Sequence, residues 1–128
     1  MVHFELDSTL ILGSLNALLG VALGAFGAHG LKSRVPAEML AVWQTAVQYH
    51  LIHALGLLAV GILLKLFPET ALLRTSGWCL TGGIVLFSGS LYLMVLSGLR
   101  PLGMITPIGG VLFLLGWLLL AVAIWRAV

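Results

Sequence analysis

Residues 105–125 read ITPIGGVLFLLGWLLLAVAIW and contain no charged side chain. An α-helix needs about 20 predominantly apolar residues to cross the hydrocarbon core of a bilayer, which is roughly 30 Å thick. This stretch is therefore long and apolar enough to span a membrane. Three further spans of the same kind are expected at residues 9–28, 50–67 and 75–96.

The composition of the whole chain agrees with a membrane protein. Hydrophobic residues make up 61% of the 128 residues, charged residues make up 8%, and the mean hydropathy is +1.18. A soluble domain has about 45–50% apolar and about 25% charged residues. We therefore predict one all-α transmembrane domain over residues 1–128, an integral membrane four-helix bundle with no room for a soluble domain.

Charge and cysteine content exclude two classes of function. Six Lys and Arg against four Asp and Glu give a net charge of +2, which is too small and too scattered for a nucleic-acid surface. The single cysteine, Cys79, excludes an intramolecular disulfide and a dithiol redox site. We expect no nucleic-acid partner and no cofactor.

Residues 36–48 connect the first two spans and carry a helical pattern of their own. Pro36 suits the first turn of a helix, and Glu38 places a negative charge near the helix N-terminus, where it is favourable. The apolar residues recur at helical spacing on one side. The pattern predicts a short interfacial amphipathic helix, with Trp43 and Tyr49 at the level of the lipid headgroups.

Four spans place both chain termini on the same side of the membrane. The basic residues divide equally between the two sides, with Lys65, Arg74 and Arg126 beside the termini and Lys32, Arg34 and Arg100 opposite. The positive-inside rule therefore does not choose an orientation.

Small residues follow one side of the first span at intervals of three or four. They are Gly13, Ala17, Gly20, Gly24 and Ala28. Small residues at this spacing let helix backbones approach closely in lipid, where van der Waals packing drives association. We predict that the first span lies in the middle of the bundle. Small-residue helix faces of this kind also offer a contact for a homo-oligomer.

Polar side chains inside the spans have two interpretations. The candidates are Asn16, Ser88, Ser90, Tyr92 and Thr106. They either form hydrogen bonds between helices, which lipid does not supply, or line a polar path through the bundle. Asp, Glu, Lys and Arg are absent from the depth of the expected spans, which disfavours an ion-coupled pump.

Three histidines surround the connection between the first two spans. His29, His50 and His53 offer three nitrogen ligands for a metal with an open fourth position. The alternative is a structural or pH-responsive role, in which they bond to a loop carbonyl or to Tyr49. Arg100 lies on the same side of the membrane, where it snorkels to the headgroups or binds a lipid phosphate.

Three motifs resemble a known family. They are GAFGAHGL at residues 24–31, WQTAVQYHLIHALGLL at 43–58 and LFSGSLYLMVLSGLRPLGMITPIGGVLFLLGW at 86–117. In order and spacing the chain resembles domain-of-unknown-function family 423, to which eukaryotic transmembrane protein 256 is similar, from about Leu10 to about Trp125. The resemblance implies a small four-helix inner-membrane protein with both termini in the cytoplasm.

The resemblance also implies which positions to follow, and His50 belongs to the family motif less clearly than the other two histidines. The motif positions are Gly24, Phe26, Gly27, His29, Trp43, Thr45, Tyr49, His53, Ser88, Gly89, Ser90, Tyr92, Thr106, Pro107 and Gly110.

The leading hypothesis is a non-enzymatic membrane protein that acts as an accessory, assembly or lipid-binding component. Its partners would be membrane lipids and other membrane proteins, and its ligand-facing or lipid-facing candidates are His29, Tyr49, His53 and Arg100. One alternative is a small transporter or channel with a polar path. A further alternative is a metal-binding or haem-binding redox membrane protein that uses the histidines.

Overall fold

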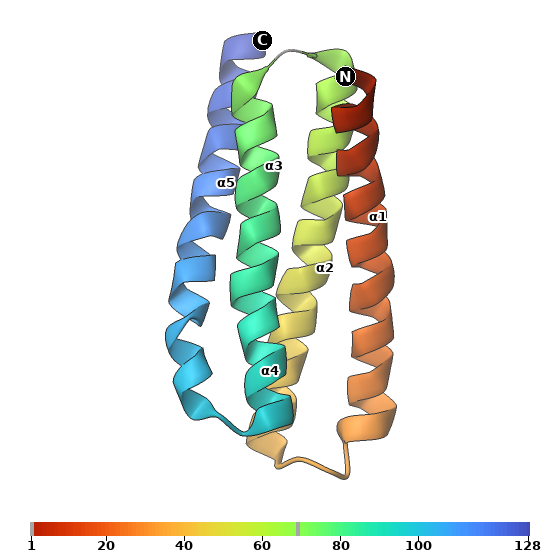
Figure 1. Ribbon diagram of the computed structural model, residues 1–128, viewed down its shortest axis with the longest axis vertical. Helices are drawn as coiled ribbons and strands as arrows, with labels where there is room; N and C mark the ends of the chain where they lie inside the picture. Colours follow the sequence, from red (N-terminus) through yellow and green to blue (C-terminus); the bar gives the residue numbers. More distant parts are fainter. Residues whose placement is uncertain (1, 69) are drawn as a thin grey trace.

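The computed structural model describes residues 2–68 and 70–128, and it describes side chains from Ser8 onward. The elements are α1 (Val2–Phe26), the π-helical turn η1 (Gly27–Leu31), α2 (Ala37–Leu66), α3 (Ala71–Gly83), the π-helical turn η2 (Ile84–Ser88), α4 (Gly89–Ser97), the 3₁₀ turn η3 (Arg100–Met104) and α5 (Thr106–Ala127). They run up and down as four elongated antiparallel rods, with both termini at one end (Figure 1).

Four segments are long and apolar enough to cross a membrane. They are Ser8–Leu31, Ala37–Leu66, Ala71–Ser97 and Arg100–Ala127. The described part of the chain contains helices and turns but no strand. The prediction of an all-α four-helix membrane bundle is confirmed.

Local sequence signals set the helix ends. Pro36 precedes α2 with an extended backbone (φ −61°, ψ 156°), and its ring fixes φ near the value that the helix also uses. At its other end α2 stops at Leu66, and Pro68 follows two residues later. Gly98 ends α4 in the left-handed region (φ 75°), which glycine adopts without a Cβ penalty.

The expected interfacial helix is not a separate element. Residues 37–66 form one continuous helix, so the range 36–48 becomes the first part of α2. No glycine or proline interrupts the chain between Ala37 and Leu55, and the apolar positions keep one helical phase from Trp43 through His50 to Leu57. Trp43 is 1% exposed and lies inside the bundle, so the prediction that it sits among headgroups is corrected.

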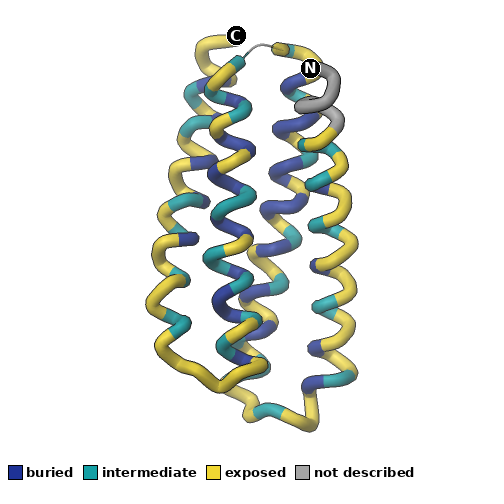
Figure 2. Tube along the Cα trace, in the orientation of Figure 1, coloured by how far each residue is buried: buried dark blue, intermediate teal, exposed yellow. Residues whose placement is uncertain are grey.

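The central helix is α2, and the expectation for the first span is also corrected. α1 packs chiefly on α2 and is the least buried of the four spans, whereas α2 is the most buried (Figure 2). The glycines of α1 and η1 do mediate close packing, because a Cβ at Gly13, Gly20 or Gly27 would press on Leu58, Leu51 or Trp43 of α2. These glycines contact only α2, so α1 packs against one helix and lies on the outside of the bundle.

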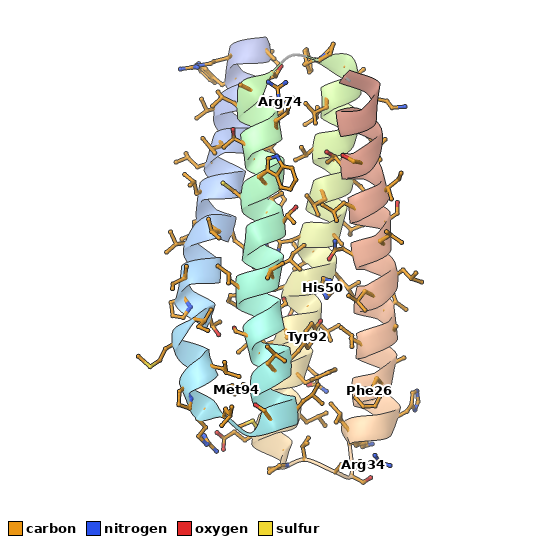
Figure 3. The ribbon with its side chains drawn as sticks, viewed as in Figure 1. Phe26, Arg34, His50, Arg74, Tyr92 and Met94 are labelled. Carbon is orange, nitrogen blue, oxygen red and sulfur yellow. The ribbon has the colours of Figure 1, made fainter. Side chains whose placement is uncertain are left out.

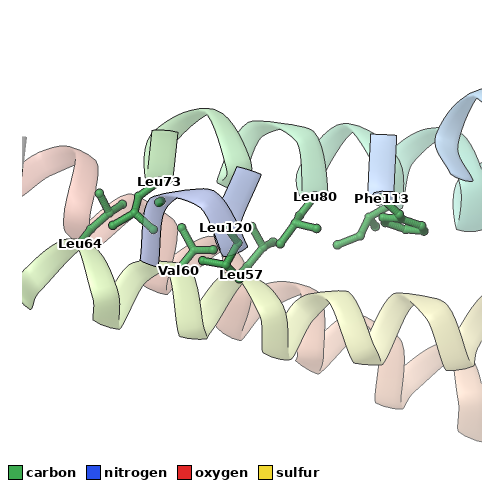
Figure 4. Packing of buried hydrophobic residues seen from close by; sticks show 9 residues of the cluster. Leu57, Val60, Leu64, Leu73, Leu80, Phe113 and Leu120 are labelled. Carbon is green, nitrogen blue, oxygen red and sulfur yellow. The ribbon is translucent and has the colours of Figure 1, made fainter. Parts of the chain in front are cut away.

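The larger apolar core lies between α2 and the α3–α5 pair (Figure 4). Its buried members are Leu57, Val60, Leu64, Leu73, Leu80, Ile84, Phe113, Leu120 and Ala123. A smaller cluster of Leu31, Trp43 and Val95 closes the end that carries the loops 32–36 and 98–99. Together the two clusters hold α2 against neighbours on both sides.

Glycines bring α5 close to α3 and η2. A Cβ at Gly83 would overlap the ring of Phe113, and one at Gly116 would press on Leu80 and Cys79. At Gly109 the obstacle is main chain, because a Cβ there would overlap backbone atoms of Leu86 and Phe87. These glycine faces are therefore occupied inside the chain.

Candidate functional site

Helix geometry places two histidines near the middle of the membrane. Glu38 and Lys65, the charged residues nearest the two ends of α2, are about 40 Å apart at a rise of 1.5 Å per residue. A bilayer is about 40–45 Å thick including its headgroups, so these charges reach the two headgroup layers. His50 and His53 lie midway between them, and not at one membrane face as the sequence suggested.

His50 joins three helices through its two ring nitrogens. Its Nδ1 lies 2.9 Å from the hydroxyl of Tyr92 in α4, and its Nε2 lies 3.0 Å from Oδ1 of Asn16 in α1. The amide nitrogen of Asn16 donates to the carbonyl of Leu12 at 2.9 Å. His50 is 2% exposed, and Figure 3 shows it between the helices with Tyr92 nearer the loop end.

These hydrogen bonds fix which atom carries each proton between Asn16, His50 and Tyr92. Because the amide of Asn16 donates to Leu12, its Oδ1 is an acceptor and His50 Nε2 carries the proton. Nδ1 of the neutral ring then accepts the hydroxyl proton of Tyr92. We call Asn16, His50 and Tyr92 the three-helix polar chain.

His53 is held by α2 and α5. Its Nδ1 donates to the carbonyl of Tyr49 at 2.6 Å, and its Nε2 accepts the indole proton of Trp117 at 2.9 Å. Since a carbonyl only accepts and an indole only donates, these partners fix a neutral ring in one tautomer. The imidazole also stacks on Phe113, with ring centroids 3.5 Å apart.

The remaining polar candidates form separate contacts between helices. The hydroxyl of Ser88 donates to the carbonyl of Ala46 at 2.7 Å. Ser90 donates to the carbonyl of Phe87, so Thr106, 2.6 Å away, donates its proton to Ser90. Among the described residues no buried polar side-chain atom lacks a partner. The five intramembrane candidates therefore take part in three separate sets of hydrogen bonds.

The three histidines do not come together around a metal position. His29 is exposed in η1 at the loop end, whereas the ring nitrogens of His50 and His53 are already paired. Within the described residues no group of three His, Cys, Asp or Glu side chains could hold a metal ion. The three-nitrogen ligand set expected from spacing is thus replaced by two buried hydrogen-bonding histidines and one exposed histidine.

The lipid-facing candidates also divide between two places. His29 and Arg100 are exposed at the loop end, where Nη1 of Arg100 lies 3.3 Å from Oε1 of Glu38. Tyr49 lies deeper on α2 and is 39% exposed, and His53 is buried beneath it. The candidates therefore do not form one binding face.

The burial of His50 and the role of Trp117 as a hydrogen-bond donor were not predicted from the sequence. His50 shares the buried face of α2 with Trp43, Ala46 and Leu57, and this three-and-four spacing was a readable signal for burial. Trp117, which donates to His53, had no such signal, since the fourth span is apolar on all sides.

Comparisons with known proteins agree with this architecture. The family described as "Protein of unknown function (DUF423)" matches residues 23–110. No solved structure matches the chain.

Bacterial relatives cover nearly the whole chain. The UPF0382 membrane protein YwdK of Bacillus subtilis is 51% identical over 114 residues, covering 89% of this chain and 93% of the relative. The UPF0382 membrane protein SSP2132 of Staphylococcus saprophyticus is 49% identical over 119 residues, covering 91% and 96%. With its four membrane-spanning helices and these relatives, the chain is an integral membrane protein and belongs to the DUF423 family.

Proposed function

We propose that this protein is a non-enzymatic component of the bacterial inner membrane that binds anionic lipid headgroups at its loop end. The loop end comprises residues 27–38 and 98–105. The observation that carries the proposal is its charge, because Lys32, Arg34 and Arg100 are exposed there and Glu38 is the single acidic residue of these two segments. Exposed basic side chains at this level attract lipid phosphates.

The order of the spans in the sequence assigns the other three acidic residues to the opposite side of the membrane. Glu5 and Asp7 precede the first span, and Glu69 lies between the second and third. Basic residues are equal in number on the two sides, so the acidic residues create the charge difference. This asymmetry supports the loop end as the anion-binding end.

Pairing of the buried polar groups supports a non-enzymatic role. General-base and nucleophilic chemistry needs a histidine nitrogen or hydroxyl that a substrate can reach. Both ring nitrogens of His50 and His53 are engaged, and Ser88 donates to a main-chain carbonyl. Sustained turnover of any substrate by the purified, reconstituted protein would contradict this part of the proposal.

Neutralising the basic loop end should weaken binding of anionic lipid. We expect the double variant Lys32→Gln, Arg34→Gln to lose at least about fivefold of its preference for phosphatidylglycerol over phosphatidylcholine, since each surface charge contributes about 1 kcal/mol. Electron paramagnetic resonance of spin-labelled lipids measures this preference. The preference of the wild-type protein should fall as salt is raised.

The matched control is Lys65→Gln, Arg126→Gln, which removes two positive charges from the opposite end. We expect this variant to keep most of the preference. An equal loss in the two double variants would mean that net charge alone attracts the lipid, and the loop-end site would be refuted.

We also propose that both termini lie in the cytoplasm. The resemblance of the three motifs to the family supports this orientation. The basic residues favour neither orientation, because equal numbers lie on the two sides. Ser33 and Val128 are exposed at opposite ends of the protein. In intact spheroplasts we expect a membrane-impermeant maleimide to label Ser33→Cys and not Val128→Cys. The reverse pattern would place the loop end in the cytoplasm.

A further inference from the structure

The outward side of α2 carries polar groups that the bundle does not use. We define the α2 outer face as Ala41, Gln44, Thr45, Gln48, Tyr49 and Ile52, all of which are exposed. They recur three or four residues apart, opposite the buried side that contains Trp43 and His50. Thr45 and Tyr49 belong to a motif singled out in the sequence. Tyr49 lies at the edge of this face, because its ring packs on Phe87 while the residue stays 39% exposed.

The depth of these groups makes them unusual. Gln44 and Gln48 lie about 9 Å and about 15 Å along α2 from Glu38, which is at headgroup level. Half of the difference between the full bilayer and its hydrocarbon core is about 5–8 Å, so Gln48 lies well inside the hydrocarbon. On α4 and α5 the exposed residues near the same end include the apolar Leu93 and Ile108.

The polar groups of this face are incompletely paired inside the chain. Thr45 donates to the carbonyl of Ala41 at 3.1 Å. The carboxamides of Gln44 and Gln48 and the hydroxyl of Tyr49 form no side-chain hydrogen bond with the described residues. Hydrocarbon supplies no hydrogen bonds, and polar side chains in spans therefore pair across helices.

We propose that the α2 outer face binds a second copy of this chain. Each carboxamide both donates and accepts, so a face with two of them is complementary to itself across a two-fold axis. Ala41 and Thr45 are small and four residues apart, which lets the two α2 helices approach closely. The face carries no charge that would repel its copy.

This contact differs from the small-residue faces expected from the sequence. The glycines of α1 are packed on α2, and Gly83, Gly109 and Gly116 are packed between α3, η2 and α5. A dimer through α2 leaves that internal packing intact. It goes beyond the proposed lipid binding, because the lipid site lies at the loop end and the dimer face lies at membrane depth.

Energy transfer between labelled copies in liposomes tests the dimer. Full-length protein carrying donor or acceptor dye should show transfer that falls as lipid is added, which gives a dissociation constant. We expect Gln44→Leu, Gln48→Leu to raise that constant at least about tenfold, because the interhelical hydrogen bonds are lost. Leucine is well suited to lipid, so this variant retains its fold.

The matched control is Leu18→Ala, Leu114→Ala, which changes two exposed apolar residues on α1 and α5. We expect it to leave the dissociation constant unchanged. Transfer that stays at background at every lipid ratio, or a constant that is equal in the glutamine variant and the wild type, would overturn the proposal.

Disulfide cross-linking in native membranes locates the contact. With Cys79 replaced by alanine, we expect Gln48→Cys to form a covalent dimer on mild oxidation and Leu18→Cys, which is also exposed but lies on α1, to form none. A dimer from Leu18→Cys would move the interface to α1. A cross-linked species that contains a different protein in place of a second copy would also refute the proposed occupant.

Discussion

Replacing Gly109 with alanine will destabilise the bundle by about 3 kcal/mol, the upper end of the range for overpacking a well-packed interior. The new Cβ would overlap backbone atoms of Leu86 and Phe87, and main chain has no rotamer into which it can retreat. α5 must therefore move away from η2, which also weakens the Thr106–Ser90 hydrogen bond. Unfolding in mixed detergent micelles measures the loss.

The adjacent glycine supplies the control. A Cβ at Gly110 would meet only the edge of the Phe87 ring, at the ordinary contact distance of 3.9 Å. We expect Gly110→Ala to be neutral or slightly stabilising, since alanine favours a helix by up to about 1 kcal/mol over glycine. Equal losses at the two positions would show that α5 does not lie against η2 as described.

The second large effect is expected at His50. His50→Leu should destabilise the protein by about 2–3 kcal/mol, because it removes one partner from each of two groups that stay inside the bundle. Asn16 Oδ1 and the Tyr92 hydroxyl would both lose the hydrogen bonds that they form with the ring. The same micelle unfolding experiment measures this loss.

A double-mutant cycle separates the polar chain from simple packing. Tyr92→Phe alone should cost about 1 kcal/mol, the net value of a typical hydrogen bond. In the His50→Leu background the same change should cost nothing or restore some stability, because it removes an unpaired hydroxyl. Strictly additive losses would contradict a hydrogen bond between the two side chains. Ile62→Leu, at an exposed position of α2 outside the proposed dimer face, serves as the neutral reference.

Much of the fold was predictable because a bilayer imposes few solutions. Long apolar stretches without charges must become helices, and four of them in a short chain must form a bundle. The sequence pattern also placed Trp43, Ala46 and His50 on one side of a helix, and that side is buried. What the pattern does not reveal is continuity, since an amphipathic stretch at residues 36–48 predicts a separate interfacial helix whereas residues 37–66 form one helix.

The partners of the polar residues were not predictable. A histidine three residues from another suggests a metal site by spacing alone, but His50 pairs with α1 and α4 while His53 pairs with α5. Which helix faces which nitrogen depends on contacts between residues 34 to 64 positions apart. Tyr92 and Asn16 were recognised as intramembrane polar residues, but their common partner follows only from the packing of three helices.

The bond between His53 and Trp117 has a consequence for how the chain is made. Ribosomes deliver the amino-terminal helices first, so α1 and α2 can pair, and Asn16 can meet His50, before α5 exists. His53 must wait for a tryptophan on the last helix to satisfy its Nε2. Until α5 is inserted, Nε2 of His53 therefore lacks its hydrogen-bond donor at the bilayer centre, and Trp117 of the final helix supplies it.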